Sequence, residues 1–136
     1  MAFAGISYIA VLVAAVASFA FGAAYYMTLA RPWMRAAGLD EERVKRDRSP
    51  LPFAISFVGE LLMAFMLAGV VGHLSTGVTL ANALVSALFV WGGFVATTMT
   101  INHRYQMQPW SLTFIDGGHW LGVLLVQALV IGLMGV

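Results

Sequence analysis

Residues 53–74 read FAISFVGELLMAFMLAGVVGHL, an apolar stretch in which Glu60 is the one charged side chain. A helix of that length rises about 33 Å, enough to cross a hydrocarbon core of about 30 Å. The stretch has no alternation of period two, and lipid offers no water to backbone polar groups, so a continuous helix is the economical form. The stretch therefore predicts a transmembrane helix.

Three further stretches have the same character and cover residues 6–29, 80–101 and 111–134. The whole chain of 136 residues is 61% hydrophobic and 10% charged, whereas a soluble domain carries about a quarter of charged residues. We therefore expect an all-α, polytopic membrane protein with four transmembrane helices in a compact bundle. At this length the bundle forms a single domain over residues 1–136, because a second domain has no room.

The seven Lys and Arg residues predict how the chain is threaded. By the positive-inside rule, the connections over residues 30–52 and 102–110 are cytoplasmic, and both termini lie outside. Residues 1–7 lack the basic start of a secretory signal, so the first span is expected to stay as a membrane anchor. The seven basic residues are Arg31, Arg35, Arg43, Lys45, Arg46 and Arg48 in the first connection and Arg104 in the second.

The connection over residues 30–52 is the stretch with soluble character. Asp40 has the residue type of a helix N-cap, and two pairs of opposite charge spaced by four follow it, so we expect a short cytoplasmic surface helix around residues 41–47. Its basic residues are a topology signal in one interpretation and hold anionic lipid in the other. The net charge of +1 gives no field for nucleic acid, which is excluded as a partner. The charged pairs are Glu41 with Lys45 and Glu42 with Arg46.

Polar side chains inside the spans are the candidates for function, because ionisable groups in a membrane are costly. Glu60 lies about 12 Å from the cytoplasmic end of its span, and Asp116 and His119 lie at about 9 and 13 Å in the last span. Two pairs of hydroxyl side chains lie at about 8 Å in the first and third spans. All four helices therefore place polar groups in one layer of the cytoplasmic half. The hydroxyl pairs are Tyr25 with Tyr26 and Thr97 with Thr98.

Asp116 and His119 are three residues apart, so they share one face of a helix. With Glu60 they can form a proton relay or an oxygen and nitrogen site for a cation, with the metal left open. This favours transport of a proton, a cation or a small solute through a cytoplasm-facing polar cavity, without a cofactor. In the alternative interpretation, Glu60 is a neutral packing residue that hydrogen-bonds neighbouring helices.

Two other function classes stay open. The first is a non-catalytic module (a scaffold, an accessory subunit or a lipid-binding bundle) that works through small-residue helix faces. The second, ranked last, is a membrane enzyme with His119 as base and Asp116 as its orienting partner. The chain has no cysteine, no serine in a nucleophile motif and no glycine loop of the phosphate-binding type.

Small residues predict close helix packing. Ala14, Ser18 and Gly22 recur at every fourth position in the first span, and Gly118 with Gly122 forms GxxxG in the last. Such faces let helix backbones approach one another, within a monomer or between copies. Because four thin helices leave much surface uncovered, we expect a homo-oligomer. Gln127 lies deeper in the last span and is expected to hydrogen-bond another helix.

Several motifs resemble a known family. Together they are similar to small bacterial four-helix integral membrane proteins that are grouped as a domain of unknown function. The resemblance extends over nearly the whole chain, and it implies a bundle in the bacterial cytoplasmic (inner) membrane without specifying an activity or a cofactor. The motifs are Phe21-Gly22-Ala23-Ala24-Tyr25-Tyr26, Arg31-Pro32-Trp33-Met34 with Ala37-Gly38-Leu39, and Phe114-Ile115-Asp116-Gly117-Gly118-His119.

Overall fold

The computed structural model describes residues 5–74 and 77–135, and the secondary structure in these ranges is helical. Within them, four helices are long and apolar enough to cross a membrane: α1, α4, the continuous helix Leu80–Tyr105 and α7. The prediction of an all-helical membrane protein with four spans is confirmed. The elements are α1 (Tyr8–Thr28), α2 (Ala30–Ala37), α3 (Glu41–Arg46), α4 (Leu51–Leu74), α5 (Leu80–Val90), η1 (Trp91–Val95), α6 (Ala96–Tyr105) and α7 (Trp110–Met134).

Local sequence explains where two of the spans begin. The Ser7 hydroxyl accepts a hydrogen bond from the Ala10 amide at the start of α1, and the Thr79 hydroxyl caps α5 in the same way. The third span is longer than predicted, because the helix continues to Tyr105. Arg104, which was expected in a connection, therefore lies in the last turn of α6.

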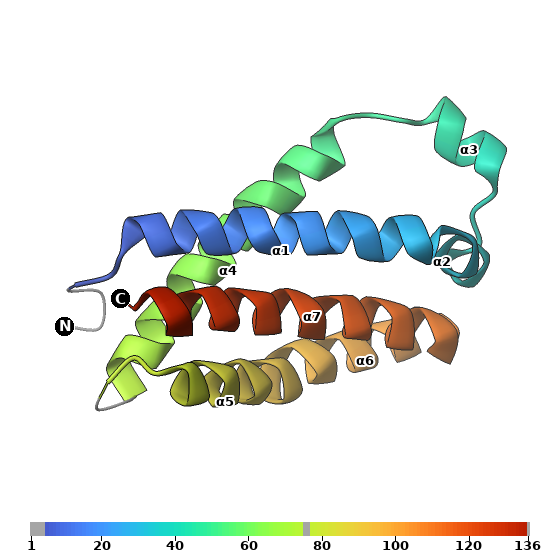
Figure 1. Cartoon of the computed structure of the whole chain (residues 1–136). Coiled ribbons are helices and arrows are strands. Elements are labelled where there is room, and N and C mark those ends of the chain that lie inside the picture. Colours follow the sequence, from blue (N-terminus) through green and yellow to red (C-terminus); the bar gives the residue numbers. More distant parts are fainter. Residues whose placement is uncertain (1–4, 75–76, 136) are drawn as a thin grey trace.

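The spans are arranged around α7. Figure 1 shows α1, α7 and the α5–α6 helix side by side along their length, with α4 crossing them obliquely. The start of α1 and the end of α7 lie at one end of the bundle, and α2 and α3 lie at the other. This arrangement is what four successive passes through a membrane produce.

The oblique crossing divides α4 into two halves. The buried residues of α4 begin at Glu60 and continue to Val71, where the helix packs on α1, α5 and α7. The first half diverges from α7 (Figure 1), and Phe53, Ile55 and Val58 on it are exposed. A cavity bordered by residues of α1, α3 and the first half of α4 lies on this side.

Small residues let α1 and α7 approach closely. An added Cβ at Gly122 would overlap the Phe21 ring, and one at Gly118 would lie 2.8 Å from the Tyr25 hydroxyl oxygen. Ala14, Ser18 and Gly22 are buried on the facing side of α1. The structure therefore uses both small-residue faces for packing within one chain.

The third span contains a feature that the sequence analysis did not predict. Its helix widens into one π-helical segment, η1. Directly at this segment, the Trp91 indole nitrogen donates a hydrogen bond of 2.9 Å to the carbonyl oxygen of Gly117 on α7. A π-helical turn holds more residues than an α-helical turn, so it changes which faces of the following helix, α6, point toward the bundle.

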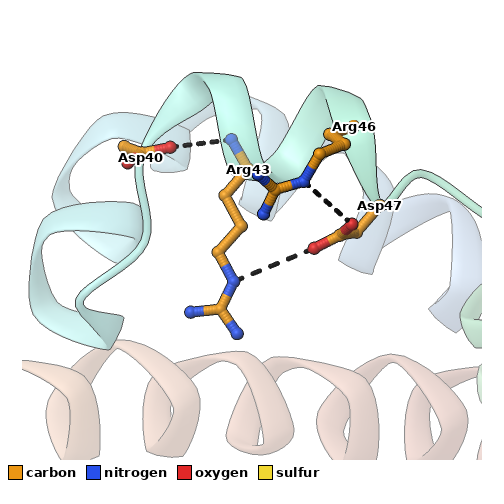
Figure 2. Close-up of polar contacts among 4 residues, drawn as sticks. All are labelled: Asp40, Arg43, Arg46 and Asp47. Atoms are coloured by element: carbon orange, nitrogen blue, oxygen red, sulfur yellow. Dashed lines mark hydrogen bonds and ion pairs between the residues drawn. The ribbon is translucent and has the colours of Figure 1, made fainter.

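The connection between the first two spans contains two short helices, of which α2 was not predicted. α2 ends at Gly38, whose φ of 71° suits glycine. α3 agrees with the predicted surface helix, and Figure 2 shows the Asp40 carboxylate accepting a hydrogen bond of 2.7 Å from the Arg43 amide.

The ion pairs expected along α3 are wrong. In this described part of the chain, the pairs that form are Arg43 with Asp47 at 3.9 Å and Arg46 with Asp47 at 3.3 Å (Figure 2). The predicted partners are exposed to solvent. Water screens the attraction between opposite charges there, so long side chains lose little free energy by staying apart. The predicted pairs that do not form are Glu41 with Lys45 and Glu42 with Arg46.

Candidate functional site

A buried polar cluster links three spans in the middle of the bundle. The Ser18 hydroxyl on α1 lies 2.6 Å from Oε2 of Glu60 on α4. The Gln127 amide on α7 donates to Ser18 Oγ at 3.1 Å and to the Glu60 carbonyl oxygen at 3.0 Å. Glu60 is 2% exposed, and Ser18 and Gln127 are fully buried. This cluster positions a carboxyl group deep inside the membrane-spanning part.

A cavity of about 430 Å³ lies between α1 and the first half of α4, and we call it the α1–α4 cavity. Four polar side chains border it: Tyr26 from α1, Ser56 and Glu60 from α4, and His119 from α7. Most of the remaining wall is apolar. It includes Phe19 and Met27 of α1, Phe53 of α4 and Val44 of α3.

One carboxyl oxygen of Glu60 has no hydrogen-bond partner among the described residues. Its Oε2 is engaged with Ser18, whereas Oε1 takes part in no hydrogen bond with the residues that the structure describes. Because Glu60 borders the α1–α4 cavity, Oε1 is the oxygen that a bound molecule can reach. The site therefore offers a carboxyl oxygen at the inner end of a largely apolar space.

His119 closes the cavity on the side of α7. Its ring centroid lies 4.6 Å from those of Tyr26 and Trp120. Its Nε2 lies against Gly22, where an added Cβ would come within 2.7 Å. Its Nδ1 is buried and has no hydrogen-bond partner among the described residues. Gly22 thus makes room for an imidazole that keeps its hydrogen-bonding capacity.

Asp116 joins this group indirectly. The Tyr26 hydroxyl donates a hydrogen bond of 2.7 Å to Asp116 Oδ1, and the Tyr25 hydroxyl donates one of the same length to the Ile115 carbonyl oxygen. Tyr25 and Tyr26 thereby tie the end of α1 to the beginning of α7. The Asp116 carboxylate is paired with a phenol and does not border the α1–α4 cavity.

Thr97 and Thr98 are not brought to the site. Their hydroxyls donate to the carbonyl oxygens of Gly93 and Phe94, four residues earlier in the same helix, and both residues are exposed. Threonine hydroxyls commonly bond their own helix in this way. Thr97 and Thr98 therefore do not border the α1–α4 cavity, whereas Tyr26, Glu60 and His119 do.

This arrangement does not provide the ligands of a metal site. Within residues 5–74 and 77–135, no group of three or more His, Asp or Glu side chains lies close enough to hold a metal ion. Glu60, Asp116 and His119 therefore do not form the oxygen and nitrogen site that their depths suggested. Glu60 and His119 remain together as borders of one cavity.

The small-residue pattern predicts only a packing role for Ser18, and its hydrogen bond to Glu60 is found in the structure alone. The available signal was that Ser18 is the polar member of an otherwise apolar small-residue face. Gln127 does hydrogen-bond other helices, as expected, and its partners are the two other members of the buried cluster.

Comparison with known proteins gives a family match. The profile of a family described as a protein of unknown function (DUF1761) matches residues 9–132. No curated protein and no solved structure matches the chain. Because the family match extends over nearly the entire sequence, the chain belongs to the DUF1761 family.

Proposed function

We propose that the protein is a membrane transporter for a small solute, which binds in the α1–α4 cavity against Glu60 and His119. The observation that carries this proposal is a cavity of about 430 Å³ between two spans with a buried carboxyl group at its inner end. Small-molecule sites usually enclose about 300–1,000 Å³, with apolar walls and a few convergent polar groups. An ionisable residue inside a membrane span marks a solute or ion pathway by default.

The composition of the cavity wall indicates which class of solute can bind. The sequence analysis expected a polar cavity, whereas most of this wall is apolar and aromatic. Such a wall suits an organic molecule with an apolar body better than a hydrated ion. Ala30 of α2 and Val44 of α3 border the cavity, so it lies toward the end of the bundle that carries these helices. The charge distribution predicts that this end faces the cytoplasm.

Movement of α4 is the conformational change that this proposal requires. The buried residues of α4 lie in its second half, from Glu60 to Val71, whereas the first half touches α1 through Phe57, whose ring packs on Phe19. A tilt of the loosely packed first half would change access to the cavity while the second half stays in place. During transport, Glu60 would then become accessible from one side of the membrane and from the other in turn.

A second candidate function is favoured by the same apolar wall. A cavity of this kind also accepts a lipid chain, in which case the protein is a lipid-binding module without transport. The two functions differ in one measurable property, because a binding module retains its ligand and moves no solute across the bilayer.

A cavity-filling substitution tests the proposal whichever small solute is carried. Wild-type protein in liposomes is exposed to a mixed panel of water-soluble amphipathic cations, anions and neutral compounds, and the internal content is measured by mass spectrometry. Ala23→Trp is expected to abolish solute uptake, because Ala23 borders the α1–α4 cavity. Ala24→Trp is the matched control, since Ala24 is also exposed on α1 and does not border the cavity.

Two results would count against transport. One is a wild-type protein that accumulates no panel compound beyond liposomes without protein. The other is equal uptake by Ala23→Trp and Ala24→Trp. A lipid that copurifies with wild type and is lost in Ala23→Trp, without uptake of any compound, would support the lipid-binding module instead.

A further inference from the structure

We propose that the solute is an organic cation of single charge, and that it exchanges for one proton on Glu60. This inference rests on the proposed function, because it names the solute class of the α1–α4 cavity. Two independent features carry it: the composition of the cavity wall and the hydrogen-bond geometry around Ser18.

The cavity wall matches a cation with an apolar body. Glu60 Oε1 is a carboxyl oxygen free of hydrogen bonds within the described residues, so it is available to pair with a positive charge. Phe19 and Phe53 supply aromatic faces, which attract cations as well as apolar groups. No Lys or Arg side chain borders the cavity in the described structure, so the wall has no permanent positive charge to pair with an anionic solute.

The hydroxyl of Ser18 has two acceptors within reach and one hydrogen to donate. Oε2 of Glu60 lies at 2.6 Å, and the carbonyl oxygen of Ala15 lies at 3.1 Å. When Glu60 is ionised, Ser18 donates to Oε2. When Glu60 is protonated, its hydroxyl donates to Ser18 Oγ, and Ser18 rotates to donate to Ala15. The hydroxyl hydrogen of serine is free to make this rotation.

Gln127 keeps this geometry in place in both charge states. Its amide nitrogen donates to Ser18 Oγ and to the Glu60 backbone carbonyl oxygen, neither of which changes its role as acceptor. The carboxyl group therefore gains or loses a proton while one hydroxyl bond rotates and no heavy atom moves.

The exchange balances in charge and atoms. The O–H bond of the Glu60 carboxyl breaks, the proton passes into cavity water, and the cation supplies the positive charge that the site loses. Reprotonation of Glu60 reverses the step and releases the cation. No other bond is formed or broken.

Glu60 is the carboxyl group available for this exchange. The helices packed on α4 are α1, α5 and α7. α1 brings Tyr26 to the cavity and α7 brings His119, while α5 contains no titratable residue. Asp116 of α7 is hydrogen-bonded by Tyr26, and Tyr25 of α1 donates to a backbone carbonyl, so neither takes part.

The test compares a permanent cation with its neutral carbon isostere. Benzyltrimethylammonium and neopentylbenzene have the same shape and differ in charge, and neither carries a proton that it can lose. Binding to the detergent-purified full chain is followed by calorimetry in buffers of different ionisation enthalpy, with micelle blanks subtracted. Wild type is expected to bind the cation at least about tenfold more tightly than the isostere and to release close to one proton per cation bound.

Two variants separate the roles of the residues. Glu60→Gln is expected to lose the preference for the cation and the proton release. Ser18→Ala is expected to weaken cation binding by about tenfold, the effect of one hydrogen bond to a charged group, while binding of the isostere stays unchanged. A packing role alone would weaken both ligands equally.

Infrared spectroscopy provides a readout that does not depend on the Ser18 variant. The ligand-free wild type should show a carboxylic acid C=O band that decreases when benzyltrimethylammonium is added and is absent from Glu60→Gln. Cation binding without proton release, or with no change in this band, would overturn the inference.

Failure of this inference is distinguishable from failure of the proposed function. If both ligands bind wild type equally and both are lost in Ala23→Trp, the cavity is a solute site and the cation assignment is wrong. If the cation exchanges for a proton and no panel compound crosses the bilayer, the site chemistry stands and transport is wrong. Absence of binding of both ligands to wild type overturns the cation assignment.

Discussion

At the residue scale, individual glycines decide where side chains and backbones meet. Gly22 admits the His119 ring to the cavity, and Gly118 admits the Tyr25 hydroxyl. Gly132 brings α7 directly against the start of α5, where an added Cβ would lie 2.6 Å from the Cα of Leu80. The first two contacts involve side chains that can move, whereas the contact at Gly132 involves backbone.

The Gly132 contact gives a prediction for stability. Gly132→Ala is expected to lower the free energy of unfolding by about 1–3 kcal/mol, because α5 and α7 must separate to admit the methyl group. Gly59→Ala is the matched control in α4, where an added Cβ meets no atom within 4 Å. The control is expected to be neutral or to stabilise by up to about 1 kcal/mol. Equilibrium unfolding in detergent measures both values, and equal losses would contradict the contact between α5 and α7.

At the element scale, short helices and one wide helical segment adjust the position of the spans. α3 contributes Val44 to the wall of the α1–α4 cavity, so its order affects the site. At its N-cap, the Asp40 side chain accepts an exposed hydrogen bond from the amide of Arg43, three residues later in the chain (Figure 2). The stability of α3 depends largely on this local interaction, because no residue of α3 is buried.

The cap of α3 is testable by a pair of substitutions. Asp40→Ala is expected to remove about 1 kcal/mol from α3, so the amides of residues 43–46 should exchange with deuterium about fivefold faster. Asp40→Asn keeps an acceptor at the same position and should leave the exchange rates close to wild type. Hydrogen exchange followed by mass spectrometry compares the two variants. Identical protection in both would show that the cap does not hold α3.

At the scale of the whole molecule, the distribution of charge predicts an orientation. α2, α3 and the end of α6 lie at the same end of the bundle (Figure 1), and these segments contain all seven Lys and Arg residues or adjoin them. By the positive-inside rule, this end is predicted to face the cytoplasm.

Single cysteines test this orientation cleanly, because the chain has no cysteine of its own. Lys45→Cys on α3 should react with a membrane-impermeant maleimide only when the cytoplasmic side is accessible. Gly77→Cys, where an added Cβ meets no atom within 4 Å, should react from the opposite side. Labelling of intact cells and of inverted vesicles provides the measurement. Labelling of both positions from the same side would contradict the fold, and exchanged sides would contradict the orientation alone.

The expected homo-oligomer stays a prediction at this scale. The small-residue faces, which could have served contacts between copies, are occupied within one chain, since Gly118 and Gly122 receive Tyr25 and Phe21. A second copy would have to dock elsewhere, and the third span offers exposed Phe89 and Phe94 on its outer side.

Part of the candidate site was predictable from residue depth along each helix. Glu60, His119 and Tyr26 were singled out by depth, and they do border one cavity. Depth says nothing about rotation around the helix axis, so it could not show that Thr97 and Thr98 bond their own helix and do not border the cavity. They follow the π-helical segment η1, whose additional residue changes the face that α6 presents.

The sequence by itself determined the number of spans, their approximate limits and the surface helix α3. Transfer of an apolar segment into lipid and capping of a helix depend on residues close together in the chain, so they can be evaluated segment by segment. Only the tertiary structure decided the oblique crossing of α4, the α1–α4 cavity and the hydrogen bonds that join Ser18, Glu60 and Gln127. These features depend on which faces of different helices meet. The faces that meet are those that give the lowest packing energy for the whole bundle, and this energy cannot be evaluated from one segment alone.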